Sequence, residues 1–344
     1  MTGYRLLVTG GAGFIGSCFV RDMLARDQQL RITVLDKLTY AGNRVNLQPA
    51  SDTAGDRLTF VQGDIADRAV VGSLLRGADA VVNFAAETHV DRSILEPDSF
   101  LATNIVGVHV LLVACADARV RFLQVSTDEV YGSVDTGESR EDDAVRASSP
   151  YSAAKAAADL LTLSYHRTFG ADVVVTRGAN TYGPYQHPEK FIPLFVTNAI
   201  EDQPLPLYGD GRQRRDWLHV SDHVAAIAHV LSHGVAGEIY NIPGNAERAN
   251  RDVAQAILDR LGKPWSLVRS VPDRPGHDRR YAMDGSRLDA LGFRHRVEFG
   301  RGLAETVDWY VQHPDWWRAI KSGDWVAYYE RQYGARLARA TTPG

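Results

Sequence analysis

Two adjacent carboxylates, Asp128 and Glu129, follow an apolar run and a hydroxyl pair in the stretch FLQVSTDEVYG (122–132). Like charges held side by side in a partly enclosed place raise each other's pKa. One interpretation is a solvated turn after a strand. The other is a site whose chemistry needs one protonated and one ionised carboxyl at once. Because neighbouring residues of a regular strand face opposite ways, the second interpretation requires the chain to turn at Asp128.

A tyrosine and a lysine four positions apart, Tyr151 and Lys155, stand in the alanine-rich stretch SSPYSAAKAAADLL. Pro150 suits the first turn of a helix and alanine favours helix, so we predict both side chains on one helix face. A phenol with a pKa of about 10 is a poor base at neutral pH, but nearby cations lower that pKa. Tyr151 is then a candidate base for removing an alcohol proton. Without further context, such a pair is more typical of a helix surface.

A glycine-rich turn, VTGGAGFIG, follows the first predicted strand and opens the first predicted helix. Gly10, Gly13 and Gly16 are spaced for a tight turn, close backbone approach and close helix packing, with helix amides free for a pyrophosphate. Asp36 ends the second predicted strand, where a carboxylate binds adenosine ribose hydroxyls and repels a 2′-phosphate. We therefore predict an NAD site rather than an NADP site, and this context favours a catalytic role for the tyrosine and lysine.

Two further charged residues, Lys37 and Asp64, belong to the predicted cofactor site. Lys37 softens the preference for NAD without reversing it. Asp64 follows the third predicted strand and is placed to meet the adenine. An N-cap of the helix that follows is an equally good interpretation of Asp64.

The elements that must position these residues alternate between short β-branched runs and helical patterns. Continuous apolar runs are typical of a parallel sheet covered on both faces, with ligands at the carboxyl ends of its strands. We predict strands at 5–10, 32–36, 58–64, 80–86, 122–127 and 172–180. We predict helices at about 14–26, 67–76, 97–117, 150–169, 221–233, 251–261 and 301–312. The fold class is α/β, a doubly wound parallel Rossmann-type sheet with a smaller C-terminal substrate-binding lobe.

Composition excludes several classes of function. The formal net charge of −4 gives no reason to expect nucleic acid as a partner. No apolar run approaches the roughly 20 residues of a membrane span, and the N-terminal stretch is not that of a signal peptide. The two cysteines, Cys18 and Cys115, are expected to be buried free thiols in a reducing cytoplasm. The 11 histidines show no metal-ligand spacing, so no metal site is expected.

The motifs together resemble the extended short-chain dehydrogenase/reductase superfamily and, within it, the dTDP-glucose 4,6-dehydratases. The stretches DKLTYAGN, AAETHVDRSI, STDEVYG, PYSAAKAAAD, NTYGPYQHPEKFIP, LPLYGDGRQRRDWLHVSDH and PGHDRRYAMD carry this resemblance in order. It runs from about residue 4 to beyond residue 310. The acidic pair after Thr127 is the most discriminating part, because related epimerases generally lack it. UDP-glucuronate decarboxylases and GDP-mannose dehydratases typically carry Thr-Ser-Glu there.

The resemblance implies a role for each catalytic residue. Tyr151, supported by Lys155, would take the proton from the hydroxyl on sugar carbon 4 as hydride passes to NAD. Glu129 would then remove the proton on carbon 5, and Asp128 would protonate the departing hydroxyl on carbon 6. The hydride would return to carbon 6. Thr127 would hydrogen-bond the oxygen on carbon 4.

Further contacts carry over by position. Additional cofactor contacts are implied at Phe14, Ile15, Thr39, Gly42, Ile65, Ala85, Ala86 and Thr103. Substrate contacts are implied at His89, Asn180, Glu189, Lys190, Pro206, Tyr208, Arg215, Asn250, Arg274, His277 and Tyr281. A solvated charged loop is an equally good interpretation of Arg274, Arg279 and Arg280. One departure bears on substrate identity, because the family usually carries asparagine where this chain has Thr181.

The implied organisation is an NAD-binding domain over 1–185, with strands contributed from later segments. A partly interleaved nucleotide-sugar lobe covers 186–330, and a flexible tail covers 331–344. The expected partners are a nucleoside-diphosphate sugar, with dTDP-glucose favoured over its uridine analogue by the resemblance alone, and a second copy of the chain. The expected dimer forms through the helices at 97–117 and 150–169, in the cytoplasm. The alternatives are a nucleotide-sugar 4-epimerase, a UDP-sugar dehydratase or decarboxylase, and a non-catalytic NAD-binding protein.

Overall fold

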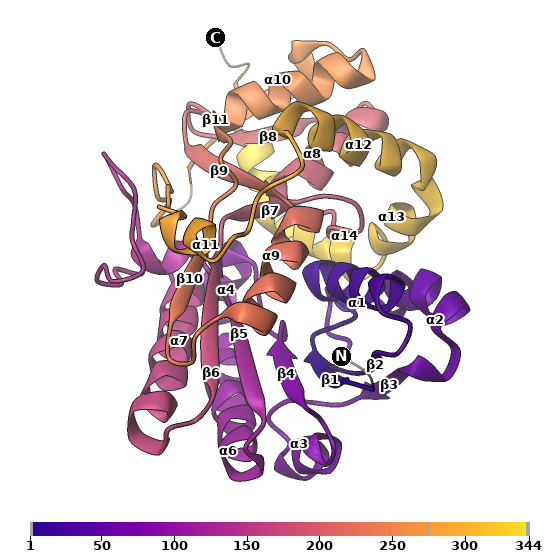
Figure 1. The fold of residues 1–344 in the computed structure, drawn as a ribbon. Helices are drawn as coiled ribbons and strands as arrows, with labels where there is room; N and C mark the ends of the chain where they lie inside the picture. The colour runs from indigo at the N-terminus through magenta and orange to yellow at the C-terminus, as the bar shows by residue number, and fades with distance from the viewer. Residues whose placement is uncertain (1–2, 274, 342–344) are drawn as a thin grey trace.

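A seven-stranded sheet forms the centre of the computed structural model, which describes residues 3–273 and 275–341 (Figure 1). All its neighbouring strands are parallel, in the order β10-β6-β5-β4-β1-β2-β3. The strands are β1 (Arg5–Thr9), β2 (Arg31–Asp36), β3 (Leu58–Gln62), β4 (Ala80–Asn83), β5 (Arg121–Thr127), β6 (Val173–Gly178) and β10 (Ile239–Ile242). The predicted parallel Rossmann-type sheet is confirmed. β3 was predicted to be buried but is only partly buried, because it is an edge strand.

Helices cover both faces of this sheet. One hydrophobic cluster joins alternate strand residues such as Leu6 and Val8 to α1, α2 and α9, and another joins Leu7 and Phe122 to α3, α6 and α7. The first set is α1 (Phe14–Arg26), α2 (Gln48–Ala54) and α9 (Val220–His233). The second set is α3 (Arg68–Leu75), α6 (Val108–Ala118) and α7 (Pro150–Phe169). The two clusters explain why the strands are apolar on both sides.

A smaller lobe packs at the carboxyl end of the sheet, at the top of Figure 1. Its small sheets combine β7 (Asn180–Tyr182), β9 (Arg214–His219) and β11 (Glu247–Ala249), and pair β8 (Leu205–Tyr208) with β12 (Val268–Val271). Its main helices are α8 (Phe191–Ile200), α10 (Asn250–Leu261) and α12 (Phe299–Gln312), around a separate apolar core. α9 packs on the main sheet and β10 is one of its strands, although both follow β7–β9 of the smaller lobe in the chain, so the two lobes interleave.

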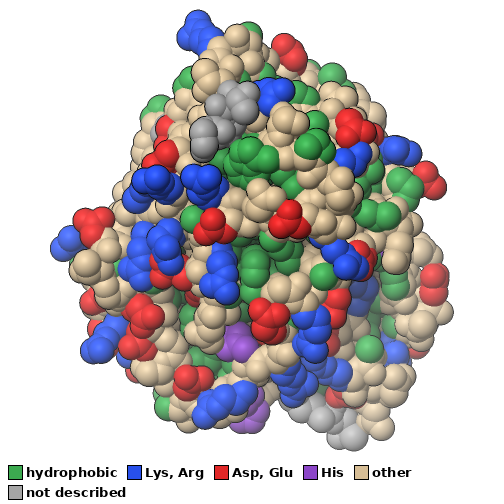
Figure 2. All heavy atoms as spheres, turned by 90° about the horizontal axis from the view of Figure 1, so that it is seen from above, with side chains coloured by type: hydrophobic (Ala, Val, Ile, Leu, Met, Phe, Trp, Pro, Cys, Tyr) green, Lys and Arg blue, Asp and Glu red, His purple; other side chains and the backbone are tan. Residues whose placement is uncertain are grey.

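Shorter elements complete the described chain. The helices are α4 (Val90–Leu95), α5 (Pro97–Leu101), α11 (Ser286–Ala290), α13 (Pro314–Ile320), α14 (Asp324–Tyr329) and α15 (Ala335–Leu337). Tighter or wider turns of helix are η1 (Arg44–Leu47), η2 (Gly55–Arg57), η3 (Ala102–Gly107), η4 (Asp128–Tyr131), η5 (Trp265–Leu267) and η6 (Glu330–Gly334). The face seen in Figure 2 carries Lys and Arg side chains interspersed with Asp and Glu, in keeping with the small net charge of −4.

One helical run corrects the sequence analysis. Pro97–Ala118, which comprises α5, η3 and α6, is long and apolar enough to cross a membrane, with a mean hydropathy of 1.9 over its most apolar window. Polar residues interrupt the run, so a search for a continuous apolar stretch misses it. In the structure 44% of that window is buried within the protein, against α3 and α7. Its last part, α6, packs between α3 and α7 in the apolar cluster on one face of the sheet.

The C-terminal segment also differs from its prediction as a flexible tail. Residues 330–337 are helical, and Gln332 and Tyr333 are buried. Thr341 forms an antiparallel bridge with Ser270 of β12. The polar composition of the segment hides an apolar contact, because Tyr333 is buried in the core of the smaller lobe and Leu337 packs against that core.

Candidate active site

The two adjacent carboxylates lie where β5 ends and η4 begins. The Thr127 hydroxyl caps η4, accepting a hydrogen bond from the Glu129 N–H at 3.2 Å. It also donates to Asp128 Oδ1 at 3.1 Å. The strand has therefore turned by Asp128, as the use of both carboxylates on one substrate requires. Asp128 is buried, whereas Glu129 is partly exposed.

The environment of Asp128 favours its protonated form. Burial, and then the neighbouring Glu129 carboxylate, raise the pKa of Asp128 well above its usual range. Its Oδ2 atom is buried and has no hydrogen-bond partner among the described residues. A protonated carboxyl with a free oxygen can donate a proton, which is the role of a general acid.

Helix α7 brings Tyr151 and Lys155 to the same place. Ser149 and Ser152 form a capping box, and Pro150 occupies the first turn, so the helix begins immediately before the tyrosine. The Lys155 ammonium donates to the Val125 carbonyl oxygen of β5 at 2.7 Å. Burial lowers the pKa of Lys155 to about 8, against the nearby charge of Asp159, which raises it.

In the protein alone, the pKa of Tyr151 lies above its ordinary value. Burial, followed by the carboxylates of Glu129 and Asp128, raises it, while a hydrogen bond with Thr127 lowers it. The protein's own charges therefore oppose ionisation of the phenol. A cationic cofactor ring, in addition to Lys155, is what could make Tyr151 an effective base.

The glycine turn has the close approaches predicted for a dinucleotide. Gly10 has a φ of 69°, and a Cβ there would lie 2.4 Å from the Ala85 backbone nitrogen. A Cβ on Gly16 would lie 2.4 Å from the Gly10 carbonyl oxygen. Only glycine fits at these two positions, so the backbone is open to a bound pyrophosphate at the N-terminus of α1.

The two carboxylates predicted at the adenosine end lie in different settings. Asp36 accepts hydrogen bonds from the backbone N–H groups of Ala12 and Leu38, at 2.9 and 2.8 Å, and burial raises its pKa. Asp64 forms an ion pair with Lys37 at 2.7 Å. The alternative of Asp64 as an N-cap is wrong, because Asp67 caps α3.

A single cavity of about 290 Å³ joins these parts. It is lined by all five predicted catalytic residues and by every predicted cofactor contact. Those contacts are Gly10, Gly13, Phe14, Ile15, Gly16, Asp36, Lys37, Thr39, Gly42, Asp64, Ile65, Ala85, Ala86, Thr103, Tyr151 and Lys155. The residues present therefore fit NAD, with a glycine cradle at one end and an acid–base cluster at the other.

Three predicted sugar or phosphate contacts, Asn180, Glu189 and Lys190, also line this cavity. The Asn180 side-chain oxygen is buried without a hydrogen-bond partner among the described residues. Glu189 forms a 2.9 Å ion pair with Arg92. Burial raises the pKa of Glu189, but nearby histidines, Arg92 and Lys190 outweigh it and lower that pKa to about 2. His89 lies outside the cavity, beside the Tyr328 hydroxyl at 3.2 Å.

The predicted nucleoside and diphosphate contacts are not part of the cavity. They are Pro206, Tyr208, Arg215, Asn250, His277 and Tyr281, while Arg274 lies outside the described residues. Arg215 is stacked 4.2 Å above the Tyr281 ring and donates to backbone carbonyls, including that of Asp278 at 2.9 Å. The Tyr208 hydroxyl accepts hydrogen bonds from Gln332 and Arg336 of the C-terminal segment. Arg215 and Tyr208 are thus hydrogen-bonded to neighbouring residues, whereas the Asn250 side-chain oxygen is buried without a hydrogen-bond partner among the described residues.

The charged loop beyond His277 is paired with its surroundings. Arg279 binds Asp210 at 2.8 Å and Arg280 binds Glu247 at 2.9 Å.

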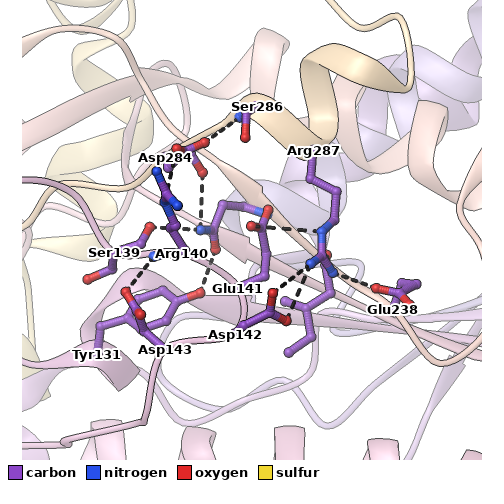
Figure 3. Close-up of polar contacts among 12 residues, drawn as sticks. Tyr131, Ser139, Arg140, Glu141, Asp142, Asp143, Glu238, Asp284, Ser286 and Arg287 are labelled. Carbon is purple, nitrogen blue, oxygen red and sulfur yellow. Dashed lines mark hydrogen bonds and ion pairs between the residues drawn. The ribbon is translucent and has the colours of Figure 1, made fainter.

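A cluster of polar side chains, which includes Tyr131, Glu141 and Arg287, fixes the segment that follows the catalytic turn (Figure 3). The Tyr131 hydroxyl donates to Asn241 Oδ1 at 2.8 Å, and the Asn241 N–H donates to Glu141 at 3.0 Å. These bonds tie η4 to β10.

The cavity includes polar side chains that the sequence analysis did not assign. Glu87, Gln186, His187 and His223 line it, although all four stand in or beside the quoted motifs. No spacing rule identifies them, because they come from three separate parts of the chain: Glu87, the adjacent Gln186 and His187, and His223 of α9. Only the fold shows that they face the same space.

Comparison with known proteins places the chain among dehydratases. Residues 7–306 match the family model described as GDP-mannose 4,6 dehydratase. The chain is 54% identical over 326 residues to a dTDP-glucose 4,6-dehydratase of Streptomyces niveus, covering 93% of this chain and 96% of that protein.

Solved structures that resemble this chain include a dTDP-glucose 4,6-dehydratase. DesIV, a dTDP-glucose 4,6-dehydratase from Streptomyces venezuelae determined with NAD and TYD bound, superposes with a TM-score of 0.90 at 53% identity. That match covers 92% of this chain and 100% of DesIV. A UDP-glucose 4-epimerase of Thermus thermophilus in complex with NAD has a TM-score of 0.82 at 32% identity, covering 90% and 99% of the two chains.

Proposed function

Because this chain belongs to the dTDP-glucose 4,6-dehydratase family, we propose that it is an NAD-dependent hydro-lyase acting on dTDP-glucose. The products are dTDP-4-keto-6-deoxyglucose and water. The observation that carries the proposal is the carboxyl pair at the start of η4, one buried with a raised pKa and one partly exposed. Elimination of water requires an acid and a base together, and this pair supplies both.

The first step is oxidation at carbon 4 of the sugar. When bound, NAD supplies the acceptor, and later the donor, of the hydride. Tyr151 removes the hydroxyl proton, and the Lys155 ammonium stabilises the resulting phenolate. Thr127, which is hydrogen-bonded to Tyr151, orients the oxygen on carbon 4.

The second step is elimination across carbons 5 and 6. The new ketone acidifies the proton on carbon 5, and the Glu129 carboxylate removes it. Asp128, kept protonated by its burial, gives its proton to the departing hydroxyl on carbon 6. Return of the hydride to carbon 6 and of a proton to carbon 5 completes the product.

The direct test is incubation with dTDP-glucose and, separately, with UDP-glucose, followed by identification of the products. We expect the 4-keto-6-deoxy sugar from dTDP-glucose. A 4-epimer would instead indicate the activity named for the Thermus relative, and binding of NAD without turnover of any nucleotide sugar would indicate a non-catalytic protein.

We also propose that the chain acts as a homodimer in the cytoplasm, away from membranes. Exposed large apolar side chains gather on α4, α5, η3 and α7, which supports a second copy as their cover. They are Ile94, Leu95, Leu101, Val106, Leu160 and Phe169. Both cysteines are free, which agrees with a reducing compartment. Light scattering of the purified protein, with Leu160→Glu as a variant, tests the dimer.

A further inference from the structure

The side-chain hydroxyl of Thr181 makes two hydrogen bonds. Its hydroxyl donates to the Ala179 carbonyl oxygen at 3.0 Å and lies 2.7 Å from Nδ1 of His223. Thr181 belongs to β7 and His223 to α9, the helix that packs beside α1. The hydroxyl thus links β7, which directly follows β6 of the central sheet, to the helix that packs beside α1.

These two contacts fix which nitrogen of His223 carries the proton. A hydroxyl has one proton to donate, and a carbonyl oxygen can only accept. Since the Thr181 hydroxyl gives its proton to Ala179, it accepts from His223, so Nδ1 is the protonated nitrogen. Nε2 then carries a lone pair. Burial lowers the pKa of His223 to about 3, so the ring is neutral at neutral pH.

The Nε2 atom is buried and has no hydrogen-bond partner among the described residues. It lies against Gly178, where a Cβ would be 2.5 Å away, and Gly178 pairs in register with Thr127. Both Gly178 and His223 line the cavity. A hydrogen-bond acceptor therefore lies in the wall of the cavity that also holds the acid–base residues.

We propose that His223 Nε2 binds the carboxamide N–H of the nicotinamide, and that Thr181 holds His223 in the tautomer that can accept it. The carboxamide is the amide donor that NAD brings to this end of the cavity. This inference rests on the proposed use of NAD. According to this inference, Thr181 and His223 together position the nicotinamide ring, which exchanges hydride with the sugar.

The test compares cofactor binding to matched variants. Thr181→Val keeps the shape of the side chain and suits a strand but removes the hydroxyl, and Thr181→Ser restores the hydroxyl. Dissociation constants are measured by calorimetry for NAD and for 3-acetylpyridine adenine dinucleotide, in which a methyl group replaces the amide nitrogen. The wild type and Thr181→Ser should favour NAD by roughly 3- to 10-fold, the range of one neutral hydrogen bond.

In Thr181→Val that preference should fall to about 1, because NAD binding weakens while analogue binding does not. Equal weakening of both cofactors would overturn the carboxamide assignment, as would an unchanged preference. If the wild type binds neither dinucleotide, the proposed use of NAD itself fails, which is a separate result.

A second measurement does not depend on affinity. In protein labelled with nitrogen-15 at histidine, Nδ1 of His223 should resonate as the protonated nitrogen and Nε2 as the unprotonated one. Addition of NAD should shift Nε2, and Thr181→Val should abolish that shift. A protonated Nε2 in the wild type would contradict the inference.

Discussion

Replacing Asp159 by asparagine should move the alkaline limit of the first oxidation step to lower pH. Asp159 lies one helical turn after Lys155 on α7 and is completely buried. Its Oδ2 atom forms a 2.9 Å ion pair with Nε of Arg177, which is also buried. Two factors shift the pKa of Lys155 in this structure: burial lowers it, and the negative charge of Asp159 raises it.

The size of the effect follows from the pKa of Lys155. With a pKa of about 8, Lys155 loses the charge that we propose supports the phenolate as pH rises through that value. At pH 7 roughly nine-tenths of the lysine is then charged, and a fall of one pKa unit, about 1.4 kcal/mol, would leave roughly half. Removing the carboxylate can only lower that pKa, so activity should decline from a lower pH than in the wild type.

The assay is stopped-flow detection of reduced nicotinamide after mixing the enzyme and NAD with substrate, repeated across pH. Asp159→Asn also leaves Arg177 buried without its partner, which costs about 3–5 kcal/mol of stability. The control is Asp159→Leu/Arg177→Met, which replaces the pair by apolar side chains and should recover stability without restoring the alkaline limit. If the limit recovers with stability, or never moves in Asp159→Asn, the reasoning about Lys155 is wrong.

Three further predictions concern the same cavity. The enzyme should bind NAD more tightly than NADP, because Asp36 would face the 2′-phosphate, and equal dissociation constants would mean that Asp36 is misassigned. Tyr151→Phe should keep its melting temperature but lose about 10²–10⁴ in the rate of oxidation, and near-normal turnover would show that the phenol is not the base. Glu129→Gln should still reduce NAD but exchange the carbon 5 proton slowly with deuterated solvent, whereas Asp128→Asn should keep that exchange and lose water slowly. A substrate with fluoride at carbon 6 should rescue Asp128→Asn more than Glu129→Gln, and equal rescue would refute the division of roles.

The sequence predicted the main sheet well, because its strands carry strong local signals. Helix α1 begins and ends at the predicted residues, and α7 does as well, since each has a distinct start in glycine or in Ser-Pro. The cofactor half of the cavity was predictable for the same reason. A glycine turn and a strand-terminal carboxylate act through nearby backbone, which the sequence displays directly.

The rest depends on long-range contacts that no local pattern displays. The hydrogen bond between Thr181 and His223 joins residues that are 42 positions apart in the sequence. The hydrogen bond from Arg336 to the Tyr208 hydroxyl joins residues that are 128 positions apart. The pKa of Tyr151 is raised by burial and by the carboxylates of Glu129 and Asp128, and the burial of a single side chain is set by the packed fold. The polar tail was misjudged for a similar reason, since its buried face exists only against the smaller lobe.

The central claim is that one hydrogen moves within the sugar, from carbon 4 to carbon 6, while water is lost between carbons 5 and 6. The most direct measurement uses dTDP-glucose deuterated at carbon 4 and follows the label by NMR of the product. We predict that the deuterium appears on carbon 6, with one hydrogen from solvent at carbon 5. Deuterium that remains on carbon 4, or that is absent from carbon 6 of the product, would contradict the assignment of this site as an internal hydride-transfer dehydratase.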